Sequence, residues 1–159
     1  MSVNRNIEEW PSDEQQKAYL AAQVFGESLV IEVRDIPRKA AVRRLLAPEA
    51  KLEDDEKALS AWLQSKGADE RKTILKFAEY VVDMTLFRML ALLDGAVGGC
   101  PLDDRTADYF IALGIYTSEE EYEAGEPSEL IRLNAPDKLD LHDYYKEWVK
   151  RFSKENEAI

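Results

Sequence analysis

Apolar residues recur at helical spacing along most of the chain and predict a mainly α-helical protein. Residues 80–93 form the longest apolar stretch, and only Asp83, Thr85 and Arg88 interrupt it. A helix that is apolar on nearly all sides is typical of the middle of a hydrophobic core. We therefore expect a long central helix over about 69–94, with the other helices packed around it.

The first two helices are bounded by local signals. A capping box that begins at Ser12 opens the first of them. Gly26 could end this helix, but apolar residues keep helical spacing beyond it, so we expect the helix to continue to about Arg34. Pro37 suits the first turn of a new helix, which is expected over residues 38–46.

Capping signals also bound the remaining helices. A third helix is expected over residues 56–66, with Gly67 in the left-handed position that follows a helix. Asp69 is the expected N-cap of the central helix, and Gly95 ends it. The last helix is expected over about 139–154, where apolar residues form one face.

The composition changes between the central helix and the last one. Aromatic and β-branched residues predict an antiparallel β-hairpin over about 108–134 with a long acidic loop. The alternative is a helix over 103–113 that ends at Gly114, followed by a short helix capped by Ser118 with Glu121 at its third position.

These elements fit one domain that spans residues 1–159, because a chain of 159 residues is too short for two domains of ordinary size. Residues 1–11 are predicted to form an N-terminal arm and residues 155–159 a frayed tail. The expected fold class is mainly α: a helical bundle around the long central helix, with a small antiparallel β-hairpin before the C-terminal helix.

The chain is strongly acidic, with a formal net charge of −11. Binding to nucleic acid needs clustered Lys and Arg, so this charge argues against nucleic acid and favours a basic partner, although it also serves solubility. The single cysteine, Cys100, cannot form an intramolecular disulfide, which favours a cytoplasmic protein. The longest apolar stretch is shorter than the ~20 residues that cross a bilayer, so no membrane association is expected.

Candidate catalytic chemistry is sparse. Cys100 has no basic residue beside it, and His142 is the only histidine in the chain. A soft metal needs further His or Cys ligands, so we interpret His142 as a packing and hydrogen-bonding residue at the start of the last helix. We expect no catalytic residue, no metal site and no cofactor.

One alternative is a small helical hydrolase that binds Mg²⁺ and a phosphate-bearing substrate through carboxylates. Glu79 and Asp83 lie four residues apart on the central helix, and Glu27 lies on the first helix. The simpler interpretation is that Asp83 and Arg88 pair with charges on neighbouring helices, because an unpaired buried charge is costly.

A second alternative is a self-associating scaffold. Its dimer contact would be either the helix that carries Trp148 or the basic face over residues 38–44. The positive cluster from Arg34 to Arg44 also has a simpler interpretation, in which its members pair with acids elsewhere in the fold.

The most distinctive surface feature is an acidic segment that contains tyrosines. Between Asp103 and Glu129 the chain has nine acidic residues against a single basic one, Arg105, and Tyr116 and Tyr122 lie among them. Interfaces use tyrosine as an anchor, and crowded like charges favour contact with the opposite charge, so this segment is predicted to bind a partner; a solvated loop is the alternative. The predicted partner-binding residues are Tyr116, Glu119, Glu120, Glu121, Tyr122, Glu123 and Glu126.

Three short parts of the chain carry a resemblance: Glu32-Val33-Arg34-Asp35, Leu92-Leu93-Asp94-Gly95, and Leu141-His142-Asp143 followed by Trp148-Val149. In them the chain resembles the small acidic immunity proteins of bacterial polymorphic and contact-dependent toxin systems. The resemblance implies a protein that binds and neutralises a toxin domain in the producing cell. Together with the acidic segment, it leads to the hypothesis that the protein covers a basic active site, such as that of a nuclease, by stoichiometric binding.

Overall fold

The computed structural model describes residues 3, 5–48, 51–96, 100–102, 105–107, 109–134 and 140–153, so the predicted tail at 155–159 lies outside the described residues. The helices are α1 (Glu14–Ser28), the π-helical segment η2 (Leu29–Asp35), α2 (Ile36–Leu45), α3 (Asp54–Gln64), α4 (Ala68–Leu93), α5 (Glu119–Ala124) and α6 (Leu141–Phe152), with a 3₁₀ turn at Ile7–Glu9. The strands are β1 (Cys100–Leu102), β2 (Arg105–Ala107), β3 (Ala112–Ile115) and β4 (Glu129–Arg132). The predicted fold class is confirmed, because the protein is mainly helical and a two-stranded antiparallel sheet precedes the C-terminal helix.

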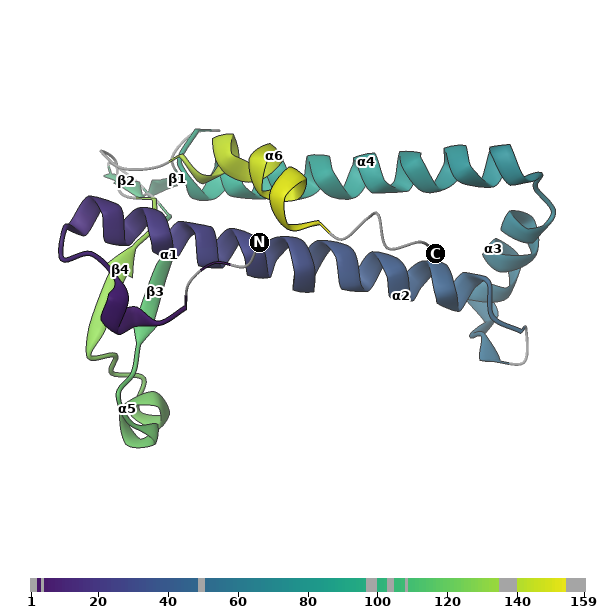
Figure 1. Cartoon of the computed structure of the whole chain (residues 1–159). Helices are drawn as coiled ribbons and strands as arrows, with labels where there is room; N and C mark the ends of the chain where they lie inside the picture. The colour runs from purple at the N-terminus through teal and green to yellow at the C-terminus, as the bar shows by residue number, and fades with distance from the viewer. Residues whose placement is uncertain are drawn as a thin grey trace.

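Two long helical arms run beside each other along the molecule (Figure 1). One arm is the continuous column of α1, η2 and α2, and the other is α4. Helix α3 joins the two arms at one end, while α6 packs against both α1 and α4 towards the other. The molecule therefore has an end closed by α6 and an end where only α3 bridges the arms.

The first arm stays helical where the sequence predicted a break. Pro37 lies in the first turn of α2, as expected, but the chain does not leave the helical conformation before it. Proline has no N–H, and its ring clashes with the carbonyl four residues earlier in a regular α-helix. The wider turns of η2 accommodate it, and the Ile36 N–H reaches the Ile31 carbonyl five residues back.

The core is centred on Trp148, whose side chain is completely buried. The helix continues through Gly26, as predicted, and the structure gives the reason for a glycine there. A Cβ atom added at Gly26 would lie 2.2 Å from Cδ2 of Trp148, so only glycine lets the indole ring pack against the α1 backbone. The buried core around Trp148 contains Val3, Ala18, Ala21, Ala22, Leu29, Val30, Leu86, Leu90, Ile131, Leu133, Leu141, Tyr145 and Phe152.

The predicted bounds of the long helix are confirmed to within one residue. Its C-terminus is a Schellman motif, in which the Ala96 N–H reaches the Ala91 carbonyl and Gly95 has a φ of 73°. At the other end the N-cap is Gly67 rather than Asp69, and the Gly67 N–H donates to Glu70. Gly67 is therefore the N-cap of α4, and its expected role as the left-handed residue after α3 is wrong.

The expectation that this helix is buried on nearly all sides is wrong. Among its residues only Leu86, Leu90 and Ala91 are buried. Nearer its N-terminus large apolar side chains face solvent, and Phe77 is 67% exposed. The physical reason is length: α6 has 12 residues against 26 in α4, so it covers only part of the longer helix.

The hairpin is confirmed, and its long loop contains the short helix of the alternative prediction. Strands β3 and β4 pair in antiparallel register, with Ala112 opposite Arg132 and Ile115 opposite Glu129. Between them lies α5, whose N-cap Ser118 accepts a hydrogen bond from the Glu121 N–H. The alternative helix over 103–113 is wrong, because β2 and part of β3 occupy those residues. Strand β1 pairs with β2 in a second small sheet that the sequence did not predict.

Candidate functional site

The predicted partner-binding residues lie together at the end of the hairpin, which we call the acidic tip (Tyr116, Glu119, Glu120, Glu121, Tyr122, Glu123 and Glu126). Figure 1 shows that α5 projects away from the rest of the molecule on the two strands β3 and β4. Every member of the acidic tip is exposed except Glu121, which is half-buried. The tip is therefore accessible on several sides.

Two tyrosines form the aromatic part of the tip. The rings of Tyr116 and Tyr122 meet edge to face, with centroids 5.2 Å apart and an interplanar angle of 82°. Tyr122 is 69% exposed, although a large aromatic side chain gains free energy when it is removed from water. The pair is a preformed apolar surface surrounded by carboxylates.

Glu121 has a local role inside the tip. Its carboxylate accepts a hydrogen bond of 2.8 Å from the Thr117 N–H and bonds to the Thr117 hydroxyl. The Thr117 backbone bond, followed by the hydroxyl bond, lowers the pKa of Glu121 below its usual value. Gly125, at φ 71°, ends α5 in the left-handed conformation. Glu121 and Gly125 fix the shape that presents the other glutamates.

Contacts at the base of the hairpin hold the tip to the body. Lys17 of α1 forms an ion pair of 2.7 Å with Glu129 of β4. The Ile111 N–H donates to the Asn134 side-chain oxygen over 2.6 Å, and Asn134 in turn donates to the Leu93 carbonyl at the end of α4. The hairpin is thus tied to both long arms.

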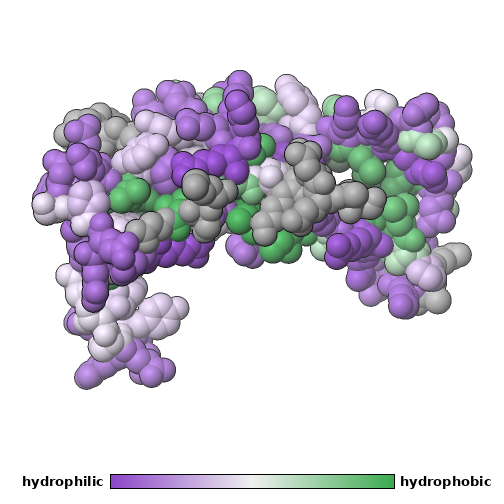
Figure 2. Space-filling model, in the orientation of Figure 1, coloured by the Kyte–Doolittle hydropathy of each residue, from purple (hydrophilic) through white to green (hydrophobic). Residues whose placement is uncertain are grey.

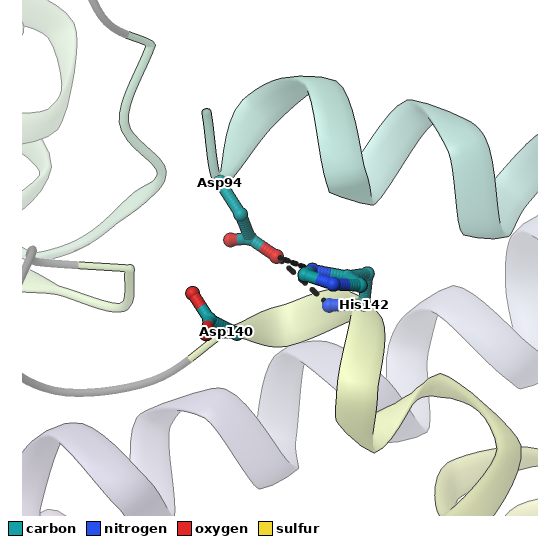
Figure 3. Close-up of side chains that lie close together, drawn as sticks. All are labelled: Asp94, Asp140 and His142. Carbon is teal, nitrogen blue, oxygen red and sulfur yellow. Dashed lines mark hydrogen bonds and ion pairs between the residues drawn. The ribbon is translucent and has the colours of Figure 1, made fainter. Parts of the chain in front are cut away.

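A second group of polar side chains joins α4 to α6 (Figure 3). Asp94 accepts hydrogen bonds from the His142 backbone N–H (2.8 Å) and interacts with the His142 Nδ1 atom (2.9 Å). The His142 ring also packs edge to face on Phe87 at 5.5 Å. The interpretation of His142 as a packing and hydrogen-bonding residue is confirmed, and Asp94 supplies a cap to the first turn of α6.

Asp94, Asp140 and His142 are also where the described chain would hold a metal ion. Their ligand atoms lie within 4.8 Å of one another, and no other such group occurs among the residues that the structure describes. The Asp94 side chain is only 1% exposed, and its Oδ1 atom has no hydrogen-bond partner in the described structure. Two carboxylates and an imidazole suit a divalent ion, but the bonds between Asp94 and His142 account for this geometry without one.

A third polar cluster is centred on Arg34, which is 2% exposed. Its guanidinium donates to Asp83 (2.5 Å) and Glu79 (3.0 Å) on α4 and to its neighbour Asp35 (2.6 Å). It also contacts Ser153, which follows α6. One buried arginine therefore connects η2, α4 and the end of α6.

These contacts bear on the carboxylates of the magnesium alternative. Glu79 also binds Arg38, Asp83 also accepts a bond of 2.8 Å from the Tyr145 hydroxyl, and Glu27 is paired with Arg5 at 3.0 Å. Burial and the bond to Asp83 raise the pKa of Tyr145 well above its usual range. The structure gives Glu27, Glu79 and Asp83 cationic partners and does not gather them into one group.

The sequence missed Arg34 as the centre of this cluster. One feature of the sequence could have indicated ion pairs between the arms. Arg34 and Arg38 are four residues apart on one arm, and Glu79 and Asp83 are four residues apart on the other. The simpler interpretation of the positive cluster is confirmed for Arg34 and Arg38, as well as for Arg44, which pairs with Glu56.

No protein-family model, curated protein or solved structure matches this chain. Among the described residues, no helix combines the length and the apolar content that crossing a membrane requires.

Proposed function

We propose that this protein is a cytosolic, immunity-type binding protein that neutralises a basic toxin domain by stoichiometric binding through the acidic tip. The observation that carries the proposal is the exposed Tyr116–Tyr122 pair, surrounded by glutamates on an element that projects from the body (Figure 1). A projecting hairpin can enter a concave active site, which a flat surface cannot do.

The two kinds of side chain would contribute differently to binding. The exposed carboxylates of Glu119, Glu120 and Glu123 would speed association with a basic surface and select against acidic ones. The tyrosine pair would slow dissociation, because its rings lose water when the partner covers them. Glu121 would act indirectly, by holding α5 in shape through Thr117.

The structure adds no support for the other two hypotheses in the form in which the sequence suggested them. The carboxylates of the magnesium alternative are paired with arginines. The self-association alternative placed the dimer contact on the helix that carries Trp148 or on the basic face over 38–44. The Trp148 side chain is completely buried within its own chain, and on the basic face Arg38 pairs with Glu79 and Arg44 with Glu56. The acidic tip remains the best-supported site.

The test is capture of the partner from the native cell with two charge-matched variants. The first variant reverses the charge of three residues of the tip: Glu119→Lys/Glu120→Lys/Glu123→Lys. The second reverses the charge of three exposed acidic residues elsewhere: Glu32→Lys/Asp55→Lys/Glu147→Lys. The wild-type protein and the second variant should retain a basic partner whose toxicity they suppress on co-expression. The tip variant should lose both the partner and the protection.

Tyr122→Ser serves as a second tip variant that leaves the charge unchanged. It should weaken binding of the same partner by about tenfold, as expected for loss of an aromatic anchor. If the tip variants bind the partner as tightly as the wild type, with the same salt dependence, the site assignment is wrong. If the captured partner has no activity that the protein suppresses, the neutralising role is wrong.

A further inference from the structure

A groove between α2 and α4 has the opposite character to the acidic tip. Its volume is about 470 Å³, which lies in the range of ~300–1,000 Å³ that is usual for ligand sites. We call it the basic groove; it is lined by Arg38, Lys39, Ala41, Val42, Leu45, Ala68, Lys72, Leu75, Lys76, Ala78, Glu79 and Val82. Figure 2 shows a hollow near the α3 end of the molecule that is bordered by apolar residues.

The floor of the basic groove is apolar. Val42 is buried, Leu45, Leu75 and Val82 are half-buried, and small alanines line the rest. The arms do not close over these residues, because α6 packs between α1 and α4 and does not extend to the α3 end. The floor offers apolar surface of the kind that an amphipathic helix needs for its apolar face.

The rim of the groove is basic in a chain whose net charge is −11. Lys72 and Lys76 are four residues apart on α4, both are exposed, and neither has an ion-pair partner among the residues that the structure describes. Like charges at this spacing repel each other. The single lining carboxylate, Glu79, does not offset them, because Arg34 and Arg38 already bind it.

We propose that the basic groove binds an acidic amphipathic helix of another protein. Apolar side chains of that helix would cover Leu75 and Val82, while its glutamates or aspartates would approach Lys72 and Lys76. The argument for this occupant is charge complementarity, since a basic rim around an apolar floor favours an acidic helix over a neutral or basic one. This inference is independent of the proposed function, which uses the acidic tip and a basic partner.

The test measures binding of two stapled, fluorescein-labelled helical peptides to the full chain by fluorescence anisotropy. Both carry leucines at helical positions i, i+3, i+4 and i+7; the flanking positions are glutamate in one peptide and lysine in the other. The glutamate peptide should bind with a salt-dependent affinity, and the lysine peptide should bind at least about tenfold more weakly.

Two variants and one control locate the binding. Lys72→Glu/Lys76→Glu should lower the affinity for the glutamate peptide by about tenfold and raise the affinity for the lysine peptide. Ala78→Phe should exclude both peptides by filling the groove. Arg43→Glu/Arg88→Glu changes the net charge equally, on exposed side chains of α2 and α4 outside the groove, and should leave binding unchanged. Circular dichroism should show the same helix content in all variants.

Equal binding of both peptides, or binding that the groove variants do not alter, would overturn the proposal. Sedimentation velocity at several protein concentrations tests the other candidate occupant. A monomer supports the proposal, whereas a dimer that Ala78→Phe dissociates would show that a second copy occupies the groove.

Discussion

The two ends of the molecule share the long helix α4 but are packed differently. At the closed end α6 lies against α1 and α4, and Trp148, Leu90 and Leu141 are completely buried. At the open end, where α3 joins the arms, α2 and α4 flank the basic groove with its apolar floor, and Phe77 faces solvent. Stability is therefore expected to reside in the closed end, while the open end keeps apolar surface for contact with other molecules.

The largest expected effect is at the boundary between the two ends, where Arg34 lies. Arg34→Met removes the buried guanidinium that pairs with Asp35, Glu79 and Asp83, and we expect a loss of about 4 kcal/mol in the free energy of unfolding, measured with urea. Arg44→Met, which breaks an exposed pair with Glu56, should have little effect. Equal effects for the two variants would show that the buried cluster does not stabilise this boundary.

A single helix can test the comparison directly, because α4 runs through both ends. Leu90→Ala removes a completely buried side chain at the closed end and should cost about 3 kcal/mol. Phe77→Ala removes an exposed side chain at the open end and should change the free energy of unfolding by less than about 0.5 kcal/mol. A large loss for Phe77→Ala would mean that its ring is covered in solution.

Gly26 tests how tightly the closed end is packed. Gly26→Ala places a methyl group against the Trp148 ring and should cost about 2 kcal/mol, even after the gain in helix propensity. The matched control is Gly67→Ser at the N-cap of α4, where the nearest atom is 3.4 Å from the added Cβ and serine is a favoured capping residue, so the thermal midpoint should not fall. A neutral Gly26→Ala would show that Trp148 can move.

Local signals predicted several helix ends, although the N-caps expected at Ser12 and Asp69 are Asp13 and Gly67 in the structure. Features that depend on distant residues were missed. Gly95 correctly ended α4, and Ser118 correctly marked α5, because caps are read within one turn. The exposure of Phe77 was not predictable, since an apolar helix looks the same whether α6 covers it or not. Arg34 became a buried centre only because the fold brings Glu79 and Asp83 beside it.

The acidic tip and the basic groove also differ in whether their residues are close together in the sequence. The acidic tip was predictable as a group, because Tyr116 and Tyr122 and the glutamates between them are close in sequence. The local role of Glu121 was suggested by its spacing from Ser118. The basic groove was not predicted, because Val42 and Leu75 come from different arms and meet only when α3 turns the chain back.

The smallest expected effect is that of pH on the stability of the acidic tip. The tip projects from the body of the molecule, and its own hydrogen bonds hold its shape. The pKa of Glu121 is lowered, first by the Thr117 N–H, so the charged carboxylate favours the folded tip. This contribution is present above the usual glutamate pKa of ~4.3 and is lost as the pH falls through the lowered pKa. The Thr117 amide resonance should therefore move with pH in that acidic range, while the thermal midpoint of the whole protein stays nearly constant.

Glu121→Gln isolates the charge, because glutamine keeps the capping hydrogen bond but does not titrate. In this variant the Thr117 amide resonance should no longer follow the pH between about 4.3 and the lowered pKa. Persistence of the titration would assign it to another carboxylate of the tip. A large fall in the thermal midpoint would instead show that the tip is coupled to the closed end through Glu129 and Lys17.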